Sequence, residues 1–285
     1  MTQRATHWVA GSHRIDLSTP VVMGILNVTP DSFSNQGEHF DTSTAIAHAE
    51  RMIAEGAGII DIGAESSRPG AEPLPLDEEL RRLLPVLRAV VPLGVPVSID
   101  TYKTEVMRRA IDLGAAIIND INALRAPGAV GVVAASQAGV CLMHMLGEPK
   151  TMQADPVYHD VVTEVQAFLQ SRVQTLASAG VDAARIAIDP GFGFGKRNED
   201  NLALFRATPA FVDTGFPVVI GVSRKSMIAR WSNRPDARPA ERVSASVTAA
   251  VLAAQAGAQI LRVHDVRDTV DALALLRAVV PRDGA

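Results

Sequence analysis

Eight short aliphatic runs, separated by longer amphipathic stretches, constrain the fold of this chain more than any other feature of its sequence. Each run is too short for a helix and is rich in Val, Ile and Leu, and each is followed by turn residues. We expect strands at residues 21–28, 58–64, 96–100, 116–120, 140–145, 185–191, 218–223 and 260–265. Strands that alternate with helices are typical of a parallel sheet.

The stretches between the runs carry helical periodicity, and several end in glycine, which can adopt the left-handed conformation that stops a helix. We expect helices at residues 42–57, 76–91, 103–115, 160–180 and 266–280. The alternative is an open doubly wound sheet, whose GxGxxG motif would follow the first strand. That place holds NVTPDSFSNQG instead. We therefore predict an α/β protein with one (β/α)8 TIM barrel domain over residues 1–285, its core at about 20–280.

A short segment precedes the first expected strand. Residues 8–17 read WVAGSHRIDL, two short runs around Gly11 and Ser12 that could form a hairpin. We expect this hairpin to cover the N-terminal mouth of the barrel.

Charge and composition exclude several classes of protein. The net charge of −4, the pI near 6.0 and the lack of a long Lys or Arg run argue against a nucleic-acid partner. The N-terminus has no apolar stretch of signal-peptide length, and no window approaches the roughly 18 apolar residues that span a bilayer. We expect a cytoplasmic protein without a membrane partner. The single cysteine, Cys141, has apolar neighbours typical of a buried thiol.

Polar residues end nearly all the expected strands, and in a (β/α)8 barrel the active site lies at these carboxyl ends. One carboxylate there could simply cap the next helix, but capping does not explain polar groups at almost every strand. Asp100, Asn119 and Asp189 suit a flat heterocycle that bears N–H donors and a carbonyl acceptor.

A second group of strand-end residues suits an anion. Arg262 and His264 are two apart on one strand, so they face the same side, and both can hold phosphate oxygens. Neither HExxH nor CxxC occurs, so structural zinc is not expected. Asn27 could supply one oxygen to a Mg²⁺ ion carried in by a phosphorylated substrate. We interpret His144 as a structural histidine.

The motifs at these positions resemble those of the dihydropteroate synthases, a family of pterin-binding enzymes. The matching segments are MGILNVTPDSFS from Met23, DIGAESSRPGA from Asp61, SIDTYK from Ser98, IINDI from Ile117, CLMHMLGEPKTMQ from Cys141, IDPGFGFGK from Ile188, GVSRKSMI from Gly221 and ILRVHDV from Ile260. The resemblance implies condensation of (7,8-dihydropterin-6-yl)methyl diphosphate with 4-aminobenzoate, giving 7,8-dihydropteroate and pyrophosphate in folate biosynthesis. It also implies that sulfonamides would mimic the amine.

The resemblance assigns roles position by position. It implies a pterin pocket formed by Asp100, Asn119, Met143, Asp189 and Lys225. It implies that Asn27, Arg262 and His264 bind the diphosphate, with Asn27 also a ligand of Mg²⁺. Catalytic roles then fall to Asp100, Lys225, Arg262 and His264, and the aminobenzoate side consists of Ser67, Arg68, Pro69, Phe194, Lys225 and Ser226.

The sequence departs from the family pattern in two loops. Asn35 and Gln36 stand where the family has Asp and Gly, and Ser67 stands where Thr is usual. The Ser67 change keeps the hydroxyl and loses a methyl contact, so we expect altered affinity for aminobenzoate or sulfonamides.

Three alternatives stay open at this point. A methyltetrahydrofolate-dependent methyltransferase shares the pterin pocket but lacks the RVHD and SRKS phrases, and a Schiff-base aldolase could use Lys225. A catalytically weak or silent pterin-binding paralogue is the third. The Ala-rich segment 244–258 could pack against a second copy, so we also predict a homodimer.

Overall fold

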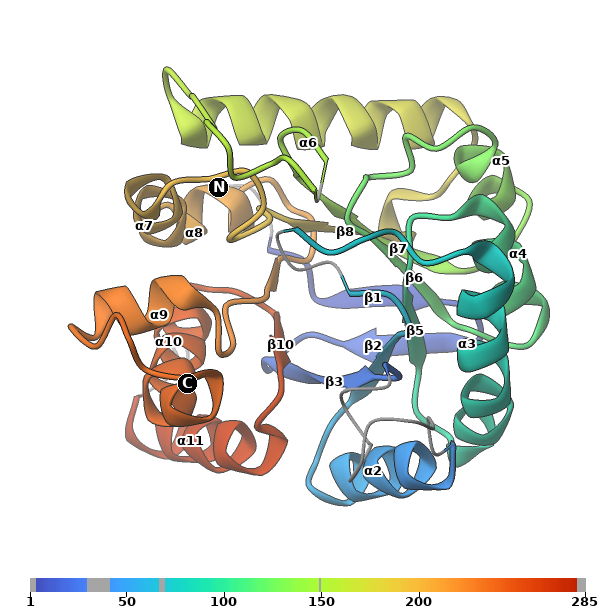
Figure 1. Ribbon diagram of the computed structural model, residues 1–285, viewed down its shortest axis with the longest axis horizontal. Helices are drawn as coiled ribbons and strands as arrows, with labels where there is room; N and C mark the ends of the chain where they lie inside the picture. The colour runs from blue at the N-terminus through green and yellow to red at the C-terminus, as the bar shows by residue number, and fades with distance from the viewer. Residues whose placement is uncertain (1–3, 30–41, 67–69, 149, 281–285) are drawn as a thin grey trace.

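Eight parallel strands form the centre of the protein in a computed structural model, which describes residues 4–29, 42–66, 70–148 and 150–280 (Figure 1). The strands are hydrogen-bonded in the order β8, β7, β6, β5, β4, β3, β10, β9. Their bounds are β3 (Val21–Asn27), β4 (Ile59–Gly63), β5 (Val97–Asp100), β6 (Ile117–Asp120), β7 (Gly139–Met143), β8 (Ile186–Asp189), β9 (Val219–Ile220) and β10 (Ile260–Val263).

The two outer strands of this order meet and nearly close the sheet into a barrel. Ile188 on β8 forms a parallel bridge with Val218, just before β9, and the Ile188 N–H donates to Pro217 O at 2.9 Å. The predicted (β/α)8 barrel is therefore confirmed. The prediction of a six-residue strand at 218–223 was too long, because the chain turns where the Lys225 N–H donates to Val222 O at 3.2 Å.

Helices surround the barrel on all sides (Figure 1). The five predicted helices are present, and each ends within a few residues of its expected end; Gly114, for example, follows α4 with a φ of 97°. The helices of the described residues are α2 (Thr42–Ala54), α3 (Leu76–Val90), α4 (Thr104–Asp112), α5 (Ala129–Ala134), α6 (Val161–Ser178), α7 (Asn198–Arg206), α8 (Thr208–Val212), α9 (Ser226–Trp231), α10 (Val243–Gln255) and α11 (Val266–Val279). In the part of the chain that the structure describes, no helix combines the length and apolar character needed to span a membrane.

Alternate residues of each strand point to the helices or to the barrel interior, as the two-residue period of a strand requires. Val22 and Leu26 pack in the core between sheet and helices, whereas Met23 points inward. One interior layer, near the amino ends of the strands, is called the lower layer. It is apolar and includes Met23, Ile59, Ile117, Cys141, Ala187, Val219 and Ile260. Burial of the Cys141 thiol is confirmed.

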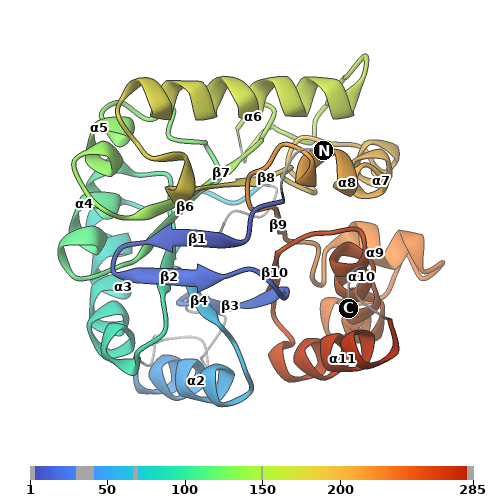
Figure 2. The same ribbon diagram turned by 180° about the vertical axis from the view of Figure 1, so that it is seen from behind.

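An N-terminal hairpin seals this apolar layer, as predicted. Strands β1 (His7–Ala10) and β2 (His13–Asp16) pair antiparallel. Figure 2 shows the hairpin lying across the centre of the ring of helices. The Trp8 side chain is fully buried in the lower layer, and its Nε1 donates to Arg185 O at 2.9 Å. The interior of the barrel at this end is therefore apolar.

We predict that Trp8→Ala lowers the free energy of unfolding by about 3–5 kcal/mol, because it leaves a cavity in the closed mouth and an unpaired carbonyl at Arg185. Urea unfolding monitored by circular dichroism measures this loss. Arg14→Ala, an exposed change on the same hairpin, is the control and should shift stability by no more than about 0.5 kcal/mol. Equal effects of the two substitutions would contradict the role given to Trp8.

Candidate active site

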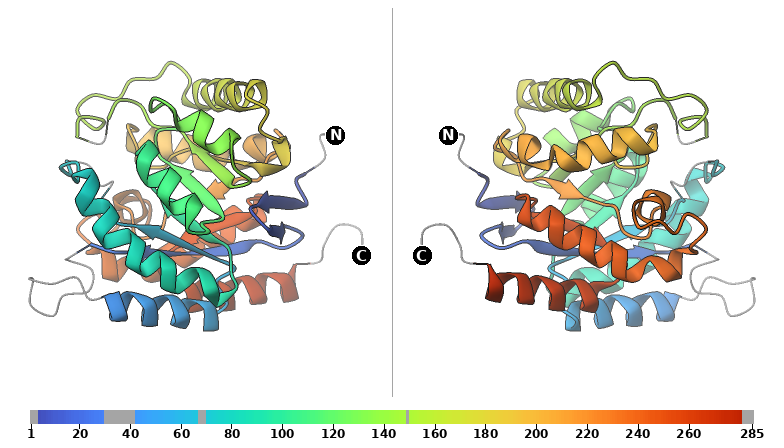
Figure 3. Two further views of the ribbon diagram at one scale, coloured as in Figure 1. Left: turned by 90° about the vertical axis from the view of Figure 1, so that its right-hand side faces the viewer. Right: turned by 90° about the vertical axis from the view of Figure 1, so that its left-hand side faces the viewer.

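The carboxyl ends of the strands bring the predicted pterin residues to one rim. Asp100 ends β5, Asn119 lies near the end of β6, and the two are register partners. Met143 and Asp189 end β7 and β8 and are likewise partners. Figure 3 shows the loop that follows β7 at the end of the molecule opposite the hairpin. Residues far apart in the sequence therefore meet at the open mouth of the barrel.

The Arg262 guanidinium links two carboxylates at the floor of this mouth. Its Nε donates to Asp61 Oδ2 at 2.6 Å, and its Nη2 donates to Asp100 Oδ2 at 2.6 Å. Asp61 is fully buried on β4, and it also accepts from Asn119 Nδ2 at 3.3 Å. Such charged hydrogen bonds are strong when they are shielded from water.

Burial shifts the protonation of the acidic groups here. It raises the pKa of Asp100 to about 7; the positive charge of Arg262 opposes this rise and the negative charge of Asp61 adds to it. Burial also raises the pKa of Asp189, against the attraction of Lys225. Carboxylates whose pKa is raised by burial beside specific charged partners are typical of functional sites.

Lys225 provides the cation next to Asp189. Its Nζ donates to Phe192 O at 2.7 Å and lies 4.7 Å from the centre of the Phe194 ring. Burial lowers the pKa of Lys225 to about 8, while Asp189 favours the charged form. Lys225 therefore connects the predicted pterin residues with Phe194 on the predicted aminobenzoate side.

An apolar wall lies beside these polar groups. Met143, Met145, Met152 and Phe194 form a buried cluster with Ile121, and Tyr102 packs against it. Methionine and aromatic side chains give polarisable surfaces on which a flat ring can lie. The mouth of the barrel thus offers hydrogen-bond acceptors, a cation and an apolar surface within one site.

Residues 191–195, the GFGFG segment, fold tightly against the segment that follows β7. A Cβ on Gly191, whose φ is 73°, would lie 1.8 Å from His144 O, so only glycine fits there. Lys196 fixes the segment from within: its buried Nζ contacts His144 Nδ1 at 2.9 Å and donates to Gly191 O at 2.8 Å. The glycines therefore allow the close approach that positions Phe194.

His144 has the structural role predicted for it. Its ring is buried, packs edge-on against Phe168 and contacts Lys196. Burial, helped by the charge of Lys196, lowers the pKa of His144 to about 2. A histidine that stays neutral at physiological pH is unsuited to acid–base exchange with a substrate.

The predicted anion residues lie around the same mouth. His264 follows β10, and its Nδ1 lies 3.0 Å from the Ser223 hydroxyl. Asn27 ends β3, where its register partner is Gly63 on β4. Arg224, by contrast, is paired with Asp265, its Nε donating to Oδ2 at 3.0 Å.

The remaining predicted residues divide into two groups. Ser226 is exposed as the first residue of α9, next to Lys225. Ser67, Arg68 and Pro69 on the second loop, and Asn35 and Gln36 on the first, lie outside the described residues.

Sequence reasoning missed Asp61. The available signal was an aspartate inside an otherwise aliphatic strand, IIDIG, where a charge is costly unless it is paired. It also missed Glu79, a buried helix residue that accepts from Thr101 Oγ1 at 2.7 Å and from Lys103 Nζ at 2.6 Å. No short motif marks Glu79, because it lies on α3 and its partners follow β5.

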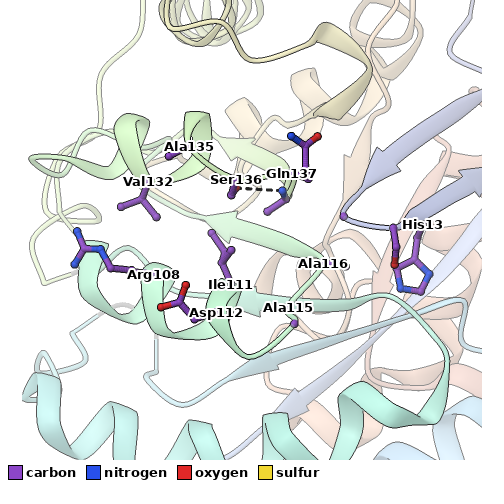
Figure 4. Close-up of a pocket in the computed structure, with 14 residues that line it drawn as sticks. His13, Arg108, Ile111, Asp112, Ala115, Ala116, Val132, Ala135, Ser136 and Gln137 are labelled. Carbon is purple, nitrogen blue, oxygen red and sulfur yellow. Dashed lines mark hydrogen bonds between the residues drawn. The ribbon is translucent and has the colours of Figure 1, made fainter.

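A cavity at the other end of the barrel is unrelated to this rim. It opens beside the hairpin turn, where α4 and α5 end, and His13, Arg108, Asp112 and Ser136 are among its lining residues (Figure 4). Its lining segments precede β6 and β7, so it lies at the amino ends of the strands. None of the predicted site residues lines it.

A parallel barrel whose open mouth combines buried acceptors, cations and an apolar wall defines an enzyme with a site for a flat heterocycle. A family model described as pterin binding enzyme matches residues 23–264. Dihydropteroate synthase of Neisseria meningitidis serogroup B is 49% identical over 95% of this chain and 97% of its own length. The corresponding enzyme of Escherichia coli strain K12 is 46% identical over 93% of this chain and 94% of its own.

Solved structures agree with these relatives. Xanthomonas albilineans dihydropteroate synthase with 4-aminobenzoic acid superposes with a TM-score of 0.90 at 47% identity, covering 97% of this chain and 100% of that one. Burkholderia cenocepacia dihydropteroate synthase complexed with 7,8-dihydropteroate gives 0.88 at 50% identity, covering 98% of each chain. The chain belongs to the pterin-binding enzyme family and, within it, to the dihydropteroate synthases, which are transferases.

We predict that Gly191→Ala destabilises the protein by more than about 2 kcal/mol, because its φ is unfavourable for alanine and its Cβ would overlap a backbone carbonyl. Gly131→Ala is the matched control: it lies within α5 with open space around it, so the change should be neutral or stabilising by up to about 1 kcal/mol. Urea unfolding of both variants measures the difference. A Gly191→Ala protein as stable as wild type would refute this account of the GFGFG segment.

Proposed function

We propose that this chain condenses (7,8-dihydropterin-6-yl)methyl diphosphate with 4-aminobenzoate, giving 7,8-dihydropteroate and pyrophosphate. The observation that carries the proposal is the convergence of Asp100, Asn119, Asp189 and Lys225 on one rim, beside Arg262. Solved relatives support it, since one contains 7,8-dihydropteroate, others contain 4-aminobenzoate, and another is a sulfonamide drug complex.

The pterin ring would lie across the acceptors of the rim. A dihydropterin presents an amino group and ring N–H groups as donors, together with a ring carbonyl as acceptor. Asp100, Asn119 and Asp189 would accept from the donors, and Lys225 would donate to the carbonyl. Met143 would contact one ring face from the apolar wall. This arrangement holds the ring by its edge and by its face.

The diphosphate would lie between Arg262, His264 and Asn27. Arg262 has five N–H donors, of which Asp61 and Asp100 use two among the residues that the structure describes, so three remain for phosphate oxygens. We infer that Mg²⁺ accompanies the diphosphate with the Asn27 amide oxygen as a ligand. A single protein oxygen is enough for this ion when phosphates and water supply the others. Bound Mg²⁺ would neutralise charge that develops on the leaving group.

The reaction would be driven mainly by electrostatic stabilisation. As the bond from the pterin methylene carbon to the diphosphate oxygen breaks, positive charge develops on the pterin and negative charge on the diphosphate. Asp100 would stabilise the cation, while Arg262 and His264 would stabilise the diphosphate. The aminobenzoate nitrogen would form the new bond to the methylene carbon, and the proton that it loses would pass to the departing diphosphate. No covalent bond to the enzyme is needed.

The amine would reach the methylene carbon from the side of Phe194. Phe194 lies against Lys225, and Ser226 follows in the chain. Ser67, Arg68 and Pro69 would complete this side, although they lie outside the described residues. Lys225 would therefore contact both substrates.

A homodimer is also proposed. Leu252 on α10 and Leu275 and Val279 on α11 are large apolar side chains with 49%, 66% and 68% exposure. Helices α10 and α11 pack against each other, so these residues could contribute to one interface. Light scattering of the purified protein tests this proposal, and a monomer at micromolar concentration would reject it. A cytoplasmic location also stays a prediction from the sequence.

The deciding experiment is a pyrophosphate-release assay with the pterin diphosphate and 4-aminobenzoate, with and without Mg²⁺. We expect release that requires both substrates and is lost when Mg²⁺ is chelated. A catalytically silent pterin-binding protein would bind the pterin diphosphate without releasing pyrophosphate, and that result would reject the proposal.

We predict that Asp100→Asn lowers kcat/KM by about 100-fold or more, because a neutral amide cannot stabilise the developing pterin cation. The fold should survive, as judged by circular dichroism. Glu50→Gln removes an exposed carboxylate on α2 and should leave kcat/KM unchanged. A normal rate in the Asp100→Asn enzyme would reject the role of Asp100.

We predict a bell-shaped pH dependence for binding of 6-hydroxymethyl-7,8-dihydropterin, a pterin without phosphate. Affinity should fall as the pH drops below about 7, because Asp100 becomes protonated and loses an acceptor, and it should fall above about 8, because Lys225 loses its charge. Titration calorimetry across this range measures the profile. In the Asp100→Asn enzyme the acid limb should disappear; if it persists, another group is responsible for it.

A further inference from the structure

Asp61 is a fully buried carboxylate that contacts two residues of the rim, and the proposed mechanism leaves it without a task. We propose that Asp61 is a positioning residue that orients the Asn119 amide and holds the Arg262 guanidinium, so that the pocket offers acceptor oxygens to the pterin. This inference rests on the proposed function. It assigns Asp61 no contact with a substrate.

Strand register places Asp61 one layer below the rim. Asp61 pairs with Ser98 on β5, and Ser98 pairs with Ile117 on β6, whereas Asp100 and Asn119 pair two residues further along. The Asp61 side chain has no solvent exposure, so it contacts the groups above it and not the open mouth.

The orientation of the Asn119 amide follows from this contact. A carboxylate can only accept hydrogen bonds, so the part of the amide turned toward Asp61 must be the NH2 group. The distances from Asn119 Nδ2 to the two Asp61 oxygens are 3.3 and 3.5 Å. The Asn119 carbonyl oxygen is then directed away from Asp61, toward the layer of the rim. Asp61 thereby makes Asn119 an acceptor for the ligand.

The position of Arg262 depends on the same carboxylate. Asp61 accepts from Nε, while Asp100 accepts from Nη2 through one oxygen, Oδ2. A guanidinium can bind one carboxylate with two parallel hydrogen bonds, which would occupy both of its oxygens. Because Asp61 takes the Nε donor, Arg262 cannot pair in that way with Asp100 through Nε and Nη2. Within the described ranges, the other oxygen of Asp100 has no hydrogen-bond partner and can accept from a ligand.

The charge of Asp61 also affects the titration of Asp100. The charged groups that act on Asp100 come from several elements. Arg262 on β10 lowers its pKa, while Asp61 on β4, Asp120 on β6 and Glu79 on α3 raise it, and Lys225 after β9 interacts with it as an opposite charge. Neutralising Asp61 removes one negative neighbour. The acid limb of pterin binding should therefore move to lower pH, which loss of packing alone would not produce.

The first test compares Asp61→Asn with Ser98→Ala. Ser98 is the β5 register partner of Asp61 and has a buried hydroxyl without a hydrogen-bond partner among the described residues, so its removal tests the same interior layer without changing the proposed contacts. The measurements are the affinity for 6-hydroxymethyl-7,8-dihydropterin against pH and the KM for 4-aminobenzoate.

We expect Asp61→Asn to weaken pterin binding by about tenfold or more, the cost of one charged hydrogen bond, and to shift the acid limb to lower pH. The KM for 4-aminobenzoate should stay the same, and Ser98→Ala should match wild type in every measurement. Wild-type pterin affinity and an unshifted pH profile in Asp61→Asn would overturn the inference. If the wild-type protein itself binds no pterin, the proposed function fails instead.

A second test exchanges the two side chains. In the double variant D61N/N119D, the residue-61 amide can donate to the residue-119 carboxylate and still accept from Arg262 Nε, while one oxygen of residue 119 faces the pocket. We expect this variant to bind the pterin more tightly than either single variant, D61N or N119D, even if one of the single variants is poorly folded. If its loss of affinity equals the sum of the two single losses, Asp61 does not act through Asn119.

Discussion

The site of this protein depends on the pairing of buried charges at the open end of the barrel. Arg262 is held between Asp61 and Asp100, and Lys225 lies near Asp189. An unpaired charge at this depth would be strongly destabilising, and breaking such a pair costs more than the pair contributes. The charges therefore specify one another's positions before a substrate arrives. Preorganised charge of this kind is the main source of electrostatic catalysis.

Two structural features keep that arrangement in place. At the closed end, Trp8 and the hairpin fill the mouth, so the apolar layer beneath the charges excludes water. At the open end, the GFGFG segment packs directly on backbone carbonyls and is fixed from within by Lys196. The result is a low-dielectric floor and a fixed wall around a polar site. Within such surroundings the pKa values of Asp100 and Lys225 approach neutrality from opposite directions, because burial disfavours both charged forms.

Most of the fold follows from local patterns in the sequence. The positions of all eight barrel strands and of the five predicted helices agree with the structure, because a buried parallel strand needs an aliphatic run and a surface helix needs an amphipathic one. The largest difference is at β9, where the aliphatic run continues past the end of the hydrogen-bonded ladder. The aliphatic run extends this far because Gly221 and Val222 are buried. Burial alone does not determine whether a residue pairs with the next strand.

The sequence by itself determined the barrel, the side of it that carries polar groups and the family to which the chain belongs, because strand ends and local motifs are contiguous in the chain. Only the tertiary structure decided which of those groups touch. Arg262 and Asp61 are two hundred and one residues apart, and their contact arises because β3 lies between β4 and β10 when the barrel closes. The direction of the Asn119 amide likewise depends on the tertiary contact with Asp61. Hydrogen bonding depends on distance and orientation, which a linear sequence pattern does not contain.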